Sequence, residues 1–357
     1  MAKITEWQLI LIGAAFILDA TLVNVPNQVI SAARMDSWLS YCIAFFVMML
    51  PLYLLAKVSH RFPNKDLFEI LIGQYAIAGR VLAMGYMLFF FYIFIRDLRM
   101  VADFVNLALL RETPMIMVLF PVIVTVILIT KGGLETIGRL TEIWFPILVI
   151  VIVGICMIIA AEFEYRYLTP MFEYGIGPSL EGCWYVLSYV GEVIAIPFLF
   201  TGGTFRFKHG FYALVIGVGS LLLLNFYTVL TLGVHIPQMT LYPTYEMVRQ
   251  LRITDFLDRF DLPLVGIWLA TMLVKIAFSL YFITLGTSRV FRGVSGQLSV
   301  TAFGILGAIC SIWFFENAIS LFNFNSPWTA LGLVFQLFLP IVIFGMMRLK
   351  RKAASRH

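Results

Sequence analysis

The feature that most constrains this sequence is a succession of long apolar segments. A bilayer core about 30 Å thick requires roughly 20 apolar residues per helix. Several segments carry no charge over their centres, for example 38–56 and 298–315. Since their hydrophobicity is continuous and does not alternate, they are predicted to be helices and not barrel strands. The ten predicted spans are 7–30, 38–57, 80–108, 115–130, 141–161, 183–205, 210–235, 263–286, 297–316 and 328–347.

Composition narrows the class of protein further. Hydrophobic residues make up 61% of the chain and charged residues 13%, against about 45–50% and about 25% in ordinary globular domains. A water-soluble core of this size cannot hide that excess, so a soluble enzyme is excluded. The four cysteines (Cys42, Cys156, Cys183 and Cys310) are far apart and show neither metal nor disulfide spacing. No catalytic constellation, cofactor or metal site is predicted.

Charge in the loops predicts the orientation. With the N-terminus inside, the inner loops and tail collect 16 of the 25 Lys and Arg residues and the outer loops collect 6. This bias predicts that both termini are cytoplasmic, and it gives no reason to expect nucleic-acid binding. The basic tail 348–357 is predicted to face anionic lipid, with a docking segment as the alternative.

The chain is expected to form one polytopic membrane domain, 1–357, because no linker divides it. Two connections are longer than a turn. The inner one, 59–79, contains an amphipathic run that predicts a short helix on the membrane surface. The outer one, 235–262, is expected to form a cap of one or two short helices.

Three charges are predicted near the middle of the membrane. At about 1.5 Å per residue, Asp19 and Lys275 lie roughly 18 Å and Glu192 roughly 14 Å into their spans. Ionisable groups at that depth are costly and usually functional. Lys275 can neutralise one carboxylate in a structural ion pair. The remaining acid must then be protonated, bind a cation or face water, as in a transport or ligand pathway.

The first and sixth spans are also predicted to be broken. Pro26 follows a polar run in the first, while Gly191, Pro197 and the 201–204 run Thr-Gly-Gly-Thr interrupt the sixth. Backbone groups freed at membrane depth are tolerated only where they line a cavity or bind something. Paired broken helices in two halves point to a transporter's central site. We therefore expect a five-plus-five inverted repeat, about 7–161 and about 179–347.

These breaks and charges define the candidate ligand-binding residues. Tyr92 joins them because it lies near 18 Å in the third span, at about 1.5 Å per residue, although ordinary packing is the alternative. The candidates are Asp19, Ala20, Thr21, Tyr92, Gly191, Glu192 and Lys275.

A separate charged cluster lies later in the third span. Its members are Arg96, Asp97, Arg99 and Asp103. Arg99 and Asp103 are spaced i, i+4 and can pair along one helix face. Counted from Arg80, Arg96 lies about 24 Å and Asp103 about 34 Å across the membrane. The cluster is therefore predicted to be an outer gate or a structural network.

With these residues in view, the chain resembles the spore germination permeases. These are the B-type membrane subunits of endospore nutrient receptors, within the amino acid–polyamine–organocation transporter superfamily. The resemblance runs nearly end to end and includes the length and the ten spans. Its motifs are Asp36-Ser37-Trp38-Leu39, Pro63 with Leu67-Phe68-Glu69, Arg111-Glu112-Thr113-Pro114, Gly138-Arg139-Leu140, Gly175-Ile176-Gly177-Pro178, Gly191-Glu192-Val193 and Phe256-Leu257-Asp258-Arg259-Phe260.

The resemblance implies an all-α, leucine-transporter-like fold with discontinuous helices 1 and 6. It also implies an amino-acid-sized site among spans one, three, six and eight, and partnership with an A-type membrane subunit and a C-type lipoprotein in the spore inner membrane. One departure is that Asp19-Ala20-Thr21 stands where the family commonly has glycines. A carboxylate there repels a ligand carboxylate unless it is protonated or paired with Lys275, so a different nutrient or a cation is an open alternative.

Two functions follow from these expectations. The first is a nutrient sensor that binds a small germinant and passes a conformational change to partner subunits. The second is a proton-coupled transporter of amino acids or other small solutes that acts alone. The shared fold does not decide between them. A purely structural scaffold is disfavoured by the broken spans.

Overall fold

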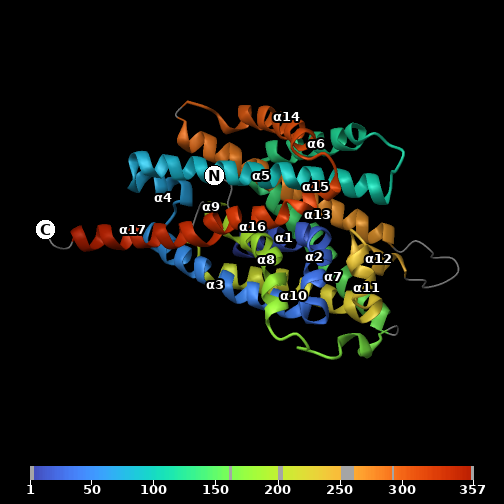
Figure 1. The fold of residues 1–357 in the computed structure, drawn as a ribbon. Helices are drawn as coiled ribbons and strands as arrows, with labels where there is room; N and C mark the ends of the chain where they lie inside the picture. Colours follow the sequence, from blue (N-terminus) through green and yellow to red (C-terminus); the bar gives the residue numbers. More distant parts are fainter. Residues whose placement is uncertain (1–3, 161–162, 200–203, 251–260, 292, 355–357) are drawn as a thin grey trace.

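The computed structural model of the 357-residue chain describes residues 4–160, 163–199, 204–250, 261–291 and 293–354, and these are predominantly helical (Figure 1). The first half contains α1 (Glu6–Asn24), α2 (Pro26–Ala33), α3 (Ser37–Arg61), α4 (Leu67–Gln74), α5 (Ala76–Ala108), α6 (Met115–Lys131) and α7 (Gly133–Ile159). The second half contains α8 (Gly177–Val190), the 3₁₀ helix η4 (Gly191–Ala195), α9 (Ile196–Leu199), α10 (Phe207–Leu232), α11 (His235–Met239), α12 (Pro243–Arg249), α13 (Asp261–Val290), α14 (Gly296–Phe314), α15 (Ala318–Asn323), α16 (Asn325–Leu333), the π-helical turn η5 (Val334–Phe338) and α17 (Leu339–Ala354).

The long helices confirm a multi-pass membrane protein. Within the described residues, nine helical stretches are long and apolar enough to cross a membrane. The 17-residue apolar helix α6 adds a shorter one, and it matches the shortest predicted span, 115–130. At about 1.5 Å per residue, α6 is roughly 25 Å long. The ten predicted spans thus correspond to these nine stretches and α6.

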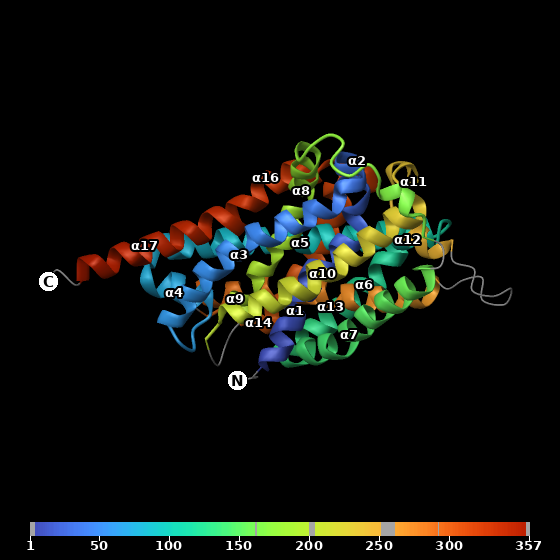
Figure 2. The ribbon, with the colours of Figure 1, turned by 90° about the horizontal axis from the view of Figure 1, so that it is seen from below.

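Both connections predicted to contain short helices do so. The inner one holds α4, whose apolar residues are buried and which packs against α5, α9 and α13. Its N-cap is Asp66, whose carboxylate accepts the backbone N–H of Glu69 at 2.8 Å. The outer connection holds α11 and α12, and its residues 251–260, including the Phe256–Phe260 motif, lie outside the described residues. Figure 2 shows both termini toward one end of the bundle and α11 and α12 toward the other.

The break in the first span is a sharp local one. Helix α1 ends at Asn24 and α2 begins at Pro26, yet hydrogen bonds from Val25 N to Thr21 O and from Val29 N to Val25 O cross the junction. Asp19, Ala20 and Thr21 lie in regular α-helix. The discontinuity is therefore a proline kink at the end of the predicted polar run, which leaves the backbone around Asp19 fully helical.

The sixth span breaks where the sequence predicts. After Val190 the backbone tightens into η4, which begins at Gly191 and contains Glu192. A Cβ atom at Gly191 would lie 2.1 Å from Gln336 Oε1, so only glycine allows this approach. The later part of the predicted break, 201–203, lies outside the described residues.

An unpredicted irregularity lies opposite η4 in the last span. The turn η5 is π-helical and carries Gln336, whose Nε2 donates to Ser188 O at 2.5 Å. Pro340 has no N–H to offer the carbonyl five residues before it, and Tyr86 Oη donates to that Phe335 oxygen at 3.0 Å. The π turn thus places one polar side chain against the 3₁₀ turn.

Helix α1 is the centre of the bundle (Figure 1). It packs against α10, α7, η4, α13 and α8, and almost all of its residues are buried. Glycines allow the close approach of α1 and α10. A Cβ atom at Gly217 would lie 2.8 Å from Ile17 Cβ and 3.1 Å from Ala14 O. The small residue sets the distance between the two helices.

This packing predicts opposite effects for two glycines of α10. Gly217→Ala should lower the free energy of unfolding by about 1–3 kcal/mol, because overpacking forces α1 and α10 apart. Gly219, two residues away, is exposed and has no atom near its missing Cβ. Gly219→Ala should raise stability by about 0.5–1 kcal/mol through helix propensity alone. Thermal unfolding of the two purified variants in detergent measures both effects, and equal shifts would contradict the packing.

Candidate functional site

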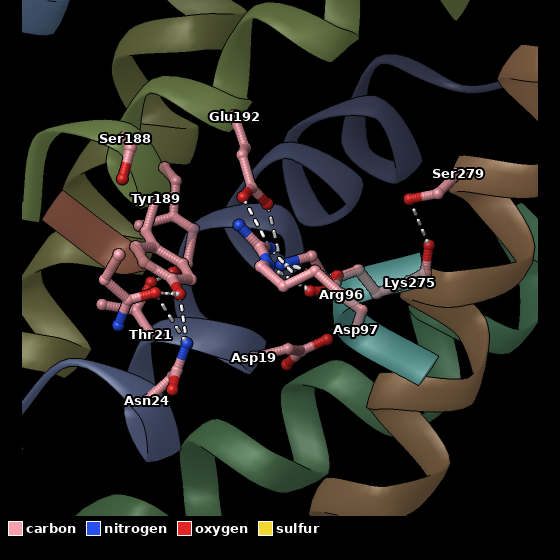
Figure 3. A network of polar contacts seen from close by, with 12 residues as sticks. Asp19, Thr21, Asn24, Arg96, Asp97, Ser188, Tyr189, Glu192, Lys275 and Ser279 are labelled. Atoms are coloured by element: carbon pink, nitrogen blue, oxygen red, sulfur yellow. Dashed lines mark hydrogen bonds and ion pairs between the residues drawn. The ribbon is translucent and has the colours of Figure 1, made fainter. Parts of the chain in front are cut away.

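Four buried charged side chains from three elements form a closed ring, which we call the ionic ring (Figure 3). Arg96 Nη2 lies 2.6 Å from Asp97 Oδ1 and 2.7 Å from Glu192 Oε1. Lys275 Nζ lies 2.9 Å from Glu192 Oε2 and 3.3 Å from Asp97 Oδ2. Each cation therefore contacts both carboxylates. The ring joins α5, η4 and α13.

The ionic ring is sealed from solvent and balanced in charge. The exposed fractions of the four residues are 1% for Arg96 and Lys275 and 0% for Asp97 and Glu192. Two cations face two anions, so the ionised ring carries no net charge. A charge buried this deeply persists only when it is paired. The ring is thus a single interdependent unit, in which each member compensates for the burial of the others.

An aromatic layer closes the ring on the side of the chain termini. Phe90 and Phe282 stack with ring centroids 4.4 Å apart, and Phe198 meets Tyr86 and Phe68 at 4.7 Å. All five residues are buried. These ring contacts join α4, α5, α9 and α13 on this side of the ionic ring.

A hydrogen-bonded polar layer closes the ring on the opposite side. Asn24 Nδ2 donates to Tyr189 Oη, and Tyr189 Oη donates to Asn325 Oδ1 at 2.7 Å. Asn325 Nδ2 donates to Gln28 Oε1 at 2.8 Å. The Arg96 guanidinium lies 4.4 Å from the centroid of the Tyr189 ring. This layer ties the α1–α2 kink to α8 and α16 and contacts the ionic ring directly.

Asp19 lies beside the ring but outside it (Figure 3). Its side chain is 0% exposed, it forms no ion pair among those of the described residues, and neither carboxylate oxygen accepts a hydrogen bond there. Its backbone oxygen accepts Trp268 Nε1 at 2.8 Å, which fixes α1 against α13. The structure brings Asp19, Glu192 and Lys275 close together, and Lys275 pairs with Glu192 and Asp97 and not with Asp19.

The other candidates occupy different surroundings. Ala20 and Thr21 are buried in α1, where the Thr21 hydroxyl donates to Ile17 O. Gly191 begins η4 beside Gln336. Tyr92 stacks on Trp328 with centroids 4.0 Å apart. These residues surround the ring or neighbour it without joining it, and their contact with a ligand stays a prediction.

The charged cluster of the third span divides into two parts. Arg96 and Asp97, predicted to lie in an outer network, belong to the ionic ring instead. Arg99 pairs with Asp103 at 2.9 Å and donates to backbone oxygens of residues 315 and 316 at the end of α14. The depth count placed Arg96 too far out because α5 has 33 residues, about 50 Å at 1.5 Å per residue, and so exceeds the membrane thickness.

Several site residues were missed by sequence reasoning. Asn24, Tyr189, Asn325 and Gln336 each place a polar group in a largely apolar span. A polar residue within an apolar span was the sequence signal that could have identified them. Their mutual contacts depend on how α1, α8 and α16 pack, which a single span does not reveal.

Comparisons with known proteins agree on one family. A family profile described as spore germination protein matches residues 3–319. The putative spore germination protein YfkT of Bacillus subtilis (strain 168) is 30% identical over 350 residues, which cover 98% of each chain. Spore germination protein KB of the same organism is 24% identical over 99% of this chain and 97% of its own.

Solved transporter structures share the fold. A Na⁺-coupled sialic acid symporter in its outward-open state superposes with a TM-score of 0.57 at 14% identity, over 93% of this chain and 79% of its own. The nucleobase-cation-symport-1 transporter Mhp1 gives 0.52 at 16% identity, over 93% and 76%. These similarities confirm the all-α, leucine-transporter-like fold.

The ring predicts a specific stability pattern. Glu192→Gln and Lys275→Met alone should each lower the free energy of unfolding by about 3–5 kcal/mol, because each leaves a buried charge uncompensated. The double variant removes one charge of each sign and should lose less than either single variant. Thermal unfolding in detergent checks this order. Additive losses would show that the two residues act independently.

Proposed function

The chain belongs to the spore germination protein family, and from this premise we propose that it is the permease-like membrane subunit of a germinant receptor. In this proposal it binds a small nutrient, such as an amino acid, at the level of the ionic ring. The bound ligand changes the packing of the helices, and the change passes to partner subunits.

The observation that carries the proposal is the ionic ring itself. It joins α5, η4 and α13 through four ion pairs in a buried layer. A small ligand that carries charged groups can replace some of these pairs without leaving charges unpaired. Such a ligand separates elements that the ring holds together. A ligand shifts a conformational equilibrium only through this kind of difference in contacts.

In this conformation the ionic ring is covered on both sides, so the proposed site must open before a ligand can bind. The aromatic layer around Phe198 and Phe282 and the polar layer around Tyr189 and Asn325 cover the ring on both sides. Nutrient entry from outside requires rearrangement of the polar layer. That layer connects to the kink at Pro26 through the hydrogen bond from Asn24 to Tyr189, so rearrangement of the layer is expected to involve α2.

Partners and location follow from the family as proposals. We expect an A-type membrane subunit and a C-type lipoprotein, the spore inner membrane, and both termini on the cytoplasmic side. Relatives of this chain include spore germination proteins A2 and B2 of Bacillus subtilis. No nucleic acid or cofactor is part of the proposal.

A second candidate function is a proton-coupled transporter of amino acids or other small solutes that acts alone. The carboxylate of Asp19, which has no hydrogen-bond or ion-pair partner among the described residues, favours it, since an extra acid beside a transport path can carry a proton. Reconstituted vesicles separate the two functions. Uptake of labelled amino acids that increases with an inward proton gradient supports the transporter, and its absence supports the sensor.

The sensor proposal predicts the behaviour of spores that carry ring variants. Glu192→Gln and Lys275→Met should each abolish the nutrient response, because each removes two of the four ion pairs. Immunoblots of spore membranes check that the variants are inserted. A matched control is Glu135→Gln, which removes the exposed ion pair to Arg139 and should leave germination unchanged. Normal germination of both ring variants at normal protein levels would refute the proposal.

A further inference from the structure

We propose that Asp19 is a proton-binding residue, which holds a proton while the ionic ring is closed and releases it as the ring opens. The inference deepens the proposed function and rests on it for the biological consequence of proton release. The protonation itself is a property of the ligand-free protein.

The burial of Asp19 supports the neutral form. The side chain is 0% exposed, and both carboxylate oxygens lack hydrogen-bond partners among the described residues. An isolated ionised carboxylate in such surroundings is far more costly than a neutral acid. The Thr271 hydroxyl lies near Asp19, but it donates to the Trp268 carbonyl at 2.8 Å. Among the described residues, no hydrogen bond or ion pair to the Asp19 carboxylate compensates a full negative charge here.

The cations near Asp19 already form ion pairs with other carboxylates. On α13 the group that acts on Asp19 is Lys275, which pairs with Glu192 and Asp97. Arg96 on α5 pairs with the same two carboxylates. With two positive and two negative charges, the ring has no surplus cation for a third carboxylate. A proton on Asp19 leaves the whole buried group neutral.

The charged groups of α10 and α7 that contact α1 do so at its first turns and not at Asp19. On α10 and α7, Lys208 and Glu142 contact the first turns of α1, through Glu6 and Gln8. His209 also faces Glu6 at 3.5 Å. These contacts lie about three turns from Asp19, at 3.6 residues per turn.

Two tyrosines complete the surroundings of α1. Tyr245 on α12 donates to Asp261 at 3.0 Å. Tyr189 on α8 exchanges hydrogen bonds with Asn24 and Asn325. The hydrogen bonds that these two hydroxyls form among the described residues are to groups other than Asp19. The electrostatic interaction between Asp19 and the ionic ring therefore acts through Lys275.

Loss of the proton would couple Asp19 to the ring. The hydrogen bond from Trp268 Nε1 to the Asp19 carbonyl keeps α1 beside α13, so an ionised Asp19 stays close to Lys275. Lys275 would then face three carboxylates, Asp19, Asp97 and Glu192. The surplus negative charge weakens the pairs that hold η4 to α13. Proton release and ring opening thus favour each other.

Infrared spectroscopy of the purified, ligand-free protein in sodium-free buffer tests the protonation. At neutral pH the wild-type spectrum should contain the carbonyl band of a protonated carboxylic acid, and Asp19→Asn should lose it. A matched control is Asp103→Asn, which alters a buried acid that is paired with Arg99 and should keep the band. Loss of a carboxylate band instead of the acid band in Asp19→Asn would overturn the inference.

The pH dependence of thermal unfolding gives a second readout. A protonated Asp19 means that the folded protein binds one more proton than the unfolded chain at neutral pH, so wild-type stability should fall as the pH rises. Asp19→Asn should lack this decline. An equal decline in both proteins would contradict a proton on Asp19. Neither measurement involves a nutrient, so their failure is distinguishable from failure of the germination test.

Discussion

Four ion pairs in a buried layer are the constraint on which the rest of this structure depends. A buried charge is tolerated only beside its counter-charge, so Arg96, Asp97, Glu192 and Lys275 must be delivered to one place by three separate elements. This requirement fixes the relative positions of α5, η4 and α13. It also makes the layer sensitive to added charge, because a further buried charge would have no counter-charge in the ring.

The irregular turns η4 and η5 help to position the charged side chains of the ring. The 3₁₀ turn carries Glu192 to the ring, and the side chain of Gln336 from the π turn approaches Gly191 so closely that a Cβ atom there would displace it. Irregular turns inside helices are frequent at functional sites. Here η4 and η5 are in contact and lie next to the ring, so a displacement of one turn changes the packing of the other.

The sequence predicted the mid-membrane acids and the lysine because a charge in a 20-residue apolar span stands out against its neighbours. It did not assign Arg96 to the site, since depth counted along an upright helix overestimates distance across the membrane for a helix as long as α5. The break in the sixth span was found from Gly191 and Pro197. In the first span the polar run at Asp19 suggested an unwound backbone, whereas hydrogen bonds keep it helical up to Pro26.

By itself the sequence determined the membrane class, the ten spans and the charged residues that stand out within apolar spans. Hydrophobicity and charge are properties of each segment alone. Which cation pairs with which acid was decided only by the tertiary structure. Lys275 had two possible acids in the sequence, and the packing of α13 against α5 and η4 gave it Asp97 and Glu192. Among the described residues Asp19 forms no ion pair, while its backbone oxygen accepts Trp268 Nε1 of α13, and no segment read on its own contains that information.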